Sequence, residues 1–164
     1  APKLSHPYLR ALRKAALGKT IFLALVWMYV TTILAIIVSE QPWKPGFTLF
    51  VLSRFSLVYA ICILFDLRDR EDDKEAGIRS IIVFLSKRNI FILFIFSTLA
   101  FAVATLWMLQ FSYPLMSILV ILIPGIIVAS LYHYAKTNFS DLLYYFVLDG
   151  LMALSAILML IPGI

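Results

Sequence analysis

Residues 47–80 read FTLFVLSRFSLVYAICILFDLRDREDDKEAGIRS and join a long apolar run to a dense cluster of charge. The apolar part, 47–65, contains one charged residue, Arg54. Six of the nine acidic residues of the chain then follow between Asp66 and Glu75, interleaved with basic residues. An apolar run of about 20 residues is long enough for a helix to cross the core of a bilayer. The stretch therefore predicts a membrane-spanning helix that leads directly into a charged segment at the membrane surface.

The rest of the chain repeats the pattern of long apolar runs. Hydrophobic residues make up 63% of its 164 residues and charged residues 14%, whereas soluble domains have about 25% charged residues. We predict an all-α integral membrane protein that forms a single domain over 1–164. Its five transmembrane helices are expected at about 20–39, 47–65, 89–109, 114–132 and 142–162, with a charged loop at 66–88.

The basic residues indicate how these helices are oriented. Of the fourteen Lys and Arg residues, twelve fall on one side of a five-span arrangement, Lys44 falls on the other, and Arg54 lies within a span. Because cytoplasmic loops are enriched in Lys and Arg, the N-terminus and the charged loop are predicted to be cytoplasmic and the C-terminus to lie opposite. We expect a bacterial inner membrane protein surrounded by membrane lipids. Membrane orientation explains the net charge of +5, so no nucleic-acid partner is expected.

The acidic residues have a spacing that suits a metal site. If the helix continues past Asp66, then Asp66, Asp69 and Asp73 fall within about 60° of one another around its axis. Close carboxylates repel one another and need a cation, and Mg²⁺ prefers oxygen ligands and is commonly bound together with substrate phosphates. The neighbouring basic residues could contact phosphate oxygens. Spacing alone leaves a second explanation open, which is that mixed charge simply keeps a loop between two spans in water.

The stretch DLRDREDDKEAGIRSI, residues 66–81, resembles the second aspartate-rich motif of the UbiA superfamily of intramembrane prenyltransferases. That motif has the form D-x-R-D-x-E-x-D-x-x-A-G-x-R-T-L-P. The matching positions are Asp66, Arg68, Asp69, Glu71, Asp73, Ala76, Gly77 and Arg79, whereas Ser80, Ile81 and Ile82 depart from it. The segment PYLRALRKAALGKT, residues 7–20, is similar to the family's entry into its fifth helix. The resemblance implies helices five to nine of a nine-helix bundle.

The resemblance also implies a function. Asp66, Asp69 and Asp73 would hold Mg²⁺, and Arg68 and Arg79 would contact an isoprenyl diphosphate. The isoprenyl group would pass to an aromatic or other lipid-soluble acceptor, and no catalytic residue is assigned beyond the metal ligands.

The family's first motif, N-D-x-x-D-x-x-x-D, does not occur in this sequence. We therefore expect the chain to be the C-terminal part of a longer prenyltransferase, with an N-terminal half or other membrane subunits as partners. The alternative is a non-catalytic membrane scaffold subunit of a larger complex, which docks through its charged loop.

Three further polar residues are candidates. Lys136 follows the fourth apolar run and is placed to contact a diphosphate. Arg54 and Asp149 are ionisable residues inside predicted spans, which makes them functional candidates. They could pair with each other; alternatively, Arg54 snorkels outward, the interpretation we favour for it, and Asp149 bonds to a neighbouring helix.

Overall fold

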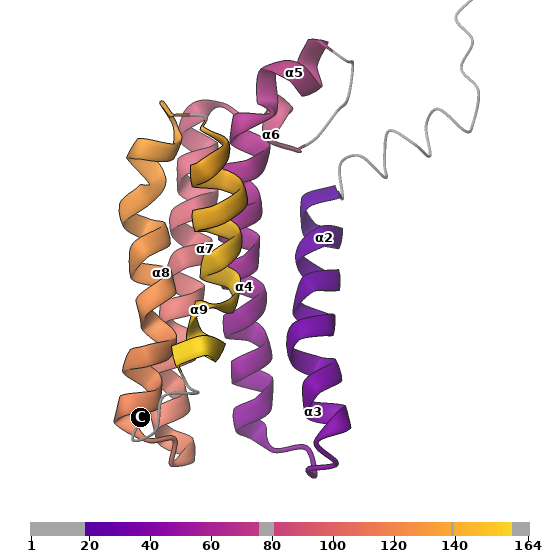
Figure 1. Cartoon of the computed structure of the whole chain (residues 1–164), viewed down its shortest axis with the longest axis vertical. Coiled ribbons are helices and arrows are strands. Elements are labelled where there is room, and N and C mark those ends of the chain that lie inside the picture. Colours follow the sequence, from indigo (N-terminus) through magenta and orange to yellow (C-terminus); the bar gives the residue numbers. More distant parts are fainter. Residues whose placement is uncertain (1–18, 76–80, 139, 159–164) are drawn as a thin grey trace, which may run out of the picture.

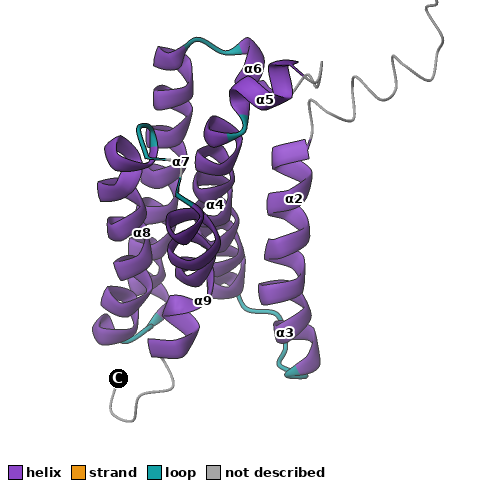
Figure 2. Ribbon diagram, turned by 45° about the horizontal axis from the view of Figure 1, so that its top comes forward, coloured by secondary structure: helices purple, strands orange, loops and turns teal. Residues whose placement is uncertain are grey.

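The structure, a computed structural model, describes residues 19–75, 81–138 and 140–158. These residues are built from helices joined by short connections (Figures 1 and 2). The first two predicted spans correspond to α2 (Lys19–Met28), the π-helix η1 (Tyr29–Ile33), α3 (Leu34–Val38) and α4 (Pro45–Arg68). The following elements are α5 (Arg70–Glu75), α6 (Ile81–Phe84), α7 (Lys87–Trp107) and the 3₁₀-helix η2 (Met108–Phe111). The last are α8 (Leu115–Ala135), the π-helix η3 (Leu142–Leu148) and α9 (Asp149–Leu158).

Four of the described helical segments are long and apolar enough to cross a membrane. They are Lys19–Val38, Pro45–Arg68, Lys87–Phe111 and Leu115–Ala135, and Leu142–Leu154 is apolar but shorter. The prediction of an all-α membrane protein is confirmed. The end of the predicted fifth span, 159–162, lies outside the described residues.

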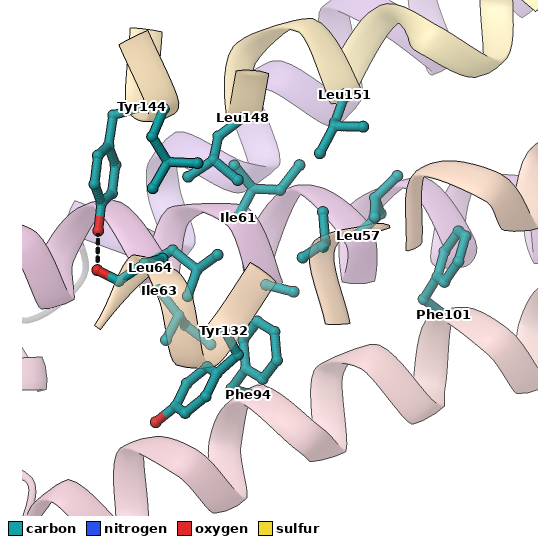
Figure 3. Packing of buried hydrophobic residues seen from close by; sticks show 14 of the residues in the cluster. Leu57, Ile61, Ile63, Leu64, Phe94, Phe101, Tyr132, Tyr144, Leu148 and Leu151 are labelled. Atoms are coloured by element: carbon teal, nitrogen blue, oxygen red, sulfur yellow. Dashed lines mark hydrogen bonds between the residues drawn. The ribbon is translucent and has the colours of Figure 1, made fainter. Parts of the chain in front are cut away.

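Helix α4 lies at the centre of the bundle. Figure 1 shows α2 on one side of it and α7 and α8 on the other, with α9 across the front. In the most apolar stretch of α4, 56% of the residues are buried, compared with 17% in that of the first span. Figure 3 shows the packing: Leu57, Ile61 and Leu64 of α4 meet Phe94 of α7 and Leu148 of η3 in one buried cluster. The central helix therefore fixes the position of everything attached to its ends.

Small and polar residues bring α4, α7 and α8 close together. The hydroxyl groups of Ser53 and Thr105 lie 2.6 Å apart, and the Ser97 hydroxyl donates to the Ser56 carbonyl at 2.8 Å. A Cβ added to Gly125 of α8 would lie 2.0 Å from Cε1 of Phe101. Close backbone approach and interhelical hydrogen bonds are the usual sources of helix association in lipid, where the apolar surroundings weaken the hydrophobic effect.

The segment predicted as a charged loop at 66–88 is largely helical where it is described. Helix α4 extends to Arg68, and the short helices α5 and α6 follow before α7 begins. Figure 2 shows α5 and α6 together at one end of the bundle. We call this the acidic end, because α5 has the sequence REDDKE.

Candidate functional site

The helix that carries the acidic residues changes direction at Asp69. The Asp69 backbone N–H donates to the Phe65 carbonyl at 3.0 Å, and the Asp73 N–H donates to the Asp69 carbonyl at 2.8 Å. Asp69 itself has φ −80° and ψ 0°, so α4 ends before it and α5 begins after it. The spanning helix thus continues past Asp66 as predicted, but with a local break at Asp69.

Asp66 and Asp73 are buried at the acidic end, with 5% and 6% of their surfaces exposed. The Thr20 hydroxyl of α2 donates to Oδ2 of Asp66, so this carboxylate faces α2. Oδ2 of Asp73 is buried and has no hydrogen-bond partner among the described residues. Leaving a buried acceptor unpaired costs free energy, more so for a charged group. The Asp73 oxygen is therefore suited to a bound cation.

Arg68 holds Asp69 in place. Nε of Arg68 lies 2.6 Å from Oδ1 of Asp69, and Nη2 donates to the Tyr145 hydroxyl at 3.1 Å. The rings of Phe65, Tyr144 and Tyr145 lie 5.5, 4.7 and 4.9 Å from the guanidinium carbon. Cation–π contacts of this kind favour a fixed guanidinium. Arg68 is thus clamped between aromatic rings and in turn orients the Asp69 carboxylate.

The two tyrosines of this clamp come from the π-helix η3. The Tyr144 hydroxyl donates to the Ala135 carbonyl at 2.8 Å, which ties η3 to the end of α8 (Figure 3). The sequence pattern assigned neither tyrosine a role, although a Tyr-Tyr pair near the start of the last apolar run was a visible signal. π-helical segments are rare, and those that occur frequently lie at functional sites.

A cavity of about 630 Å³ lies beside Asp69. Its charged lining consists of Arg68, Arg70, Lys87, Lys136, Asp69, Glu71, Asp72 and Asp141. Two predicted diphosphate contacts, Arg68 and Lys136, therefore meet Asp69 at one cavity. Asp66 and Asp73 are not among its described lining residues, and Arg79 lies outside the described residues.

The three predicted metal ligands have different surroundings: Asp66 accepts from Thr20, Asp69 pairs with Arg68, and Asp73 has a buried oxygen without a described partner. The charges of Asp69 and Asp73 act electrostatically on the Asp66 carboxylate, as does that of Lys19. Among the described residues, no three His, Cys, Asp or Glu side chains are arranged to hold a metal ion. Carboxylate oxygens are nevertheless the ligands that Mg²⁺ prefers, and one Asp73 oxygen is buried without a described partner. The donor set therefore fits Mg²⁺ in its chemistry.

Arg54 and Asp149 line a second cavity, of about 380 Å³. Arg54 is only 5% exposed, and its Nη2 donates to the Met152 carbonyl of α9. The interpretation that Arg54 snorkels outward is therefore wrong, because the guanidinium is buried and bonded to the backbone of a neighbouring helix.

Comparison with known protein families gave a match over most of the chain. The model of the UbiA prenyltransferase family matches residues 8–157, well over half of the chain. The matched region includes the acidic end and both cavities. The comparisons with curated proteins and with solved structures gave no match.

Proposed function

The chain belongs to the UbiA prenyltransferase family, and from this premise we propose that it acts in the Mg²⁺-dependent transfer of an isoprenyl group from its diphosphate to a lipid-soluble acceptor. The observation that carries this proposal is the state of the carboxylates at the acidic end. Asp66 and Asp73 are buried, and Asp73 has an oxygen without a partner among the described residues. Carboxylates that served only to keep a loop in water would be expected on its exposed surface.

In this proposal the three aspartates Asp66, Asp69 and Asp73 would hold Mg²⁺. The ion supplies positive charge that neutralises a diphosphate and helps it to leave. Arg68 uses Nε on Asp69 and one Nη2 hydrogen on Tyr145. Its other N–H donors, out of five, have no hydrogen-bond partner among the described residues and could bind phosphate oxygens. Lys136, which lines the same cavity, would bind further phosphate oxygens as a point charge. Arg79 is proposed as an additional phosphate contact from its place in the motif.

The acidic end is proposed to face the cytoplasm of a bacterial cell. The distribution of Lys and Arg supports this orientation, since twelve of the fourteen lie on that side of a five-span arrangement. An isoprenyl chain would then extend from a diphosphate at the membrane surface into the apolar bundle.

We also propose that a preceding part of the same protein carries the family's other acidic motif. This sequence contains one aspartate-rich motif, on α4 and α5. The measurement is the intact mass of the native subunit. A mass well above 18.6 kDa is expected, and a mass equal to it would contradict this part of the proposal.

The proposed activity is tested on the native protein in membranes, with geranyl and farnesyl diphosphate as probes and a membrane lipid extract as the source of acceptor. We expect Asp69→Asn and Asp73→Asn each to lower Mg²⁺-dependent prenyl transfer by more than about 100-fold, beyond the 10- to 100-fold typical of residues that only support a metal ligand. The matched control is Glu75→Gln, an exposed acidic residue of α5 that is not among the lining residues of either cavity, and this variant should retain activity. Wild-type activity in the Asp69 and Asp73 variants would refute the assignment.

A further inference from the structure

The second cavity lies within the membrane-spanning part of the bundle, between the first span, α4 and α9. Its lining residues are Trp27, Thr31, Arg54, Asp149, Met152 and Ala153. All six belong to apolar helical segments. Its volume of about 380 Å³ falls in the range of small-molecule sites, about 300–1,000 Å³. The cavity is therefore large enough for the polar head of an amphiphile.

The cavity has an unusual concentration of charge for its depth. Ionisable side chains within the hydrocarbon region are costly and usually mark a functional site. Arg54 is buried and bonded to the Met152 carbonyl, one turn beyond Asp149. Asp149 is exposed, and a Cβ added to the adjacent Gly150 would meet no atom within 4 Å. The cavity thus has a buried cationic residue on one wall and an exposed anionic residue on another helix.

The other side chains make the cavity amphipathic. Thr31 lies in the π-helix η1. Its hydroxyl donates to the Trp27 carbonyl at 2.7 Å and lies 3.5 Å from the Thr32 hydroxyl, and a hydroxyl oxygen has two lone pairs with which to accept. Trp27, Met152 and Ala153 supply apolar surface. A matching ligand carries an anionic or carbonyl oxygen for Arg54, a hydroxyl for Asp149, and an apolar body.

Two helical segments lead from the cavity to the acidic end. Arg54 and Asp66 are twelve residues apart on α4, or about 18 Å along the helix. Asp149 and Tyr145 belong to one helical segment, Leu142–Leu154, and the Tyr145 hydroxyl accepts a hydrogen bond from Arg68 at the acidic end. This segment therefore links the cavity to the proposed diphosphate site.

We propose that this cavity binds the polar head of the lipid-soluble acceptor, with Arg54 holding an anionic or carbonyl oxygen and Asp149 accepting a hydrogen bond from a hydroxyl. The assignment rests on the proposed prenyl transfer for the identity of the ligand as acceptor. The binding site itself is tested without that activity.

Trp27 provides the probe, because it lines the cavity. The native protein is prepared with Trp43→Phe and Trp107→Phe, so that Trp27 is the only tryptophan of this chain, and with any tryptophans elsewhere in the protein also replaced by Phe. Fluorescence quenching is measured with 4-bromobenzoate, 4-bromophenol and bromobenzene, which differ in the polar group. We expect saturable quenching by the first two and only weak, partition-like quenching by bromobenzene. Equal quenching by all three would overturn the proposal.

Two substitutions should change the affinity for 4-bromobenzoate in opposite directions. Arg54→Gln should weaken 4-bromobenzoate binding by on the order of 10- to 100-fold, as expected for loss of a charge-assisted hydrogen bond. Asp149→Asn removes a like charge, so it should strengthen 4-bromobenzoate binding and weaken 4-bromophenol binding. The control Lys44→Gln removes a cation that lines a different cavity, and it should change neither. Misfolding cannot produce opposite shifts for two probes, and unchanged affinities in both variants would refute the site.

Prenyl transfer supplies the second readout. In an active preparation, Arg54→Gln should raise the KM for acceptor and leave the KM for isoprenyl diphosphate unchanged. If Asp69→Asn and Asp73→Asn are fully active, the proposed diphosphate site fails while the probe-binding result stands. If those variants are inactive but Arg54→Gln leaves the acceptor KM unchanged, the acceptor assignment fails alone.

Discussion

Asp73→Asn separates a metal ligand from a structural residue, because it should change stability in opposite directions with and without Mg²⁺. In EDTA the wild-type carboxylate is buried, and Oδ2 has no described partner, at a cost of about 1–3 kcal/mol. The uncharged amide has a smaller desolvation penalty, so the variant should be as stable as wild type or up to about 2 kcal/mol more stable. At a Mg²⁺ concentration about 100 times Kd, wild type should gain about 2.7 kcal/mol, and the variant should lose that gain.

The assay is thermal unfolding of the native protein in detergent, followed by labelling of Cys62 with a thiol-reactive fluorophore. Cys62 is the one cysteine of this sequence and is buried in the structure. If the native protein has cysteines elsewhere, they are replaced by Ser. A change of 1 kcal/mol corresponds to a shift of about 2–4 °C in Tm for a domain of this size. Glu75→Gln, the exposed control on α5, should follow wild type in both conditions. Clear destabilisation of Asp73→Asn in EDTA, or a full Mg²⁺ response in this variant, would contradict a role of Asp73 as a metal ligand.

Three further variants test the surroundings of the site. Gly125→Ala should lower stability by about 1–3 kcal/mol through overpacking against Phe101; the same unfolding assay checks this, and adding Phe101→Leu should restore part of the loss. Tyr145→Phe removes a hydrogen bond to Arg68, so Mg²⁺ titration of prenyl transfer should show a several-fold higher Mg²⁺ requirement. Thr20→Val removes the hydroxyl that donates a hydrogen bond to the buried Asp66 carboxylate, so it should lower the free energy of unfolding by about 1–3 kcal/mol in the thermal assay. Unchanged stability would indicate that water solvates the Asp66 carboxylate instead.

The sequence predicted the helices well, because hydrocarbon length and apolar composition leave few alternatives. The span expected at 47–65 is observed as Pro45–Arg68, and it extends into the charged segment. The arrangement of helices around α4 could not be predicted in the same way. The spans Lys19–Val38 and Pro45–Arg68 have similar mean hydropathies, 2.6 and 2.1. Nevertheless, 17% of the residues are buried in the most apolar stretch of the first and 56% in that of the second. Hydropathy reports the need to avoid water and does not distinguish a lipid neighbour from a protein neighbour.

The acidic residues were found from their local motif, but their partners were not. Arg68 and Asp69 are adjacent in sequence, so their pairing was within reach of a local pattern. Tyr145 lies 77 residues from Arg68, and Thr20 lies 46 residues from Asp66. No local spacing connects such residues, because only the packing of η3 and α2 against α4 brings them together.

In the π-helix η3, the number of residues matters as much as their identity for the directions in which the side chains face. Tyr144 is fully buried and Tyr145 is 59% exposed, yet both rings reach the same guanidinium. A π-helix bonds each N–H to the carbonyl five residues earlier, where an α-helix uses four. Deleting a single residue within 142–148 would turn the helix before and after it by about 100° relative to each other. Either the tyrosine clamp or Asp149 would then face the wrong way, so this segment should tolerate substitution far better than any insertion or deletion.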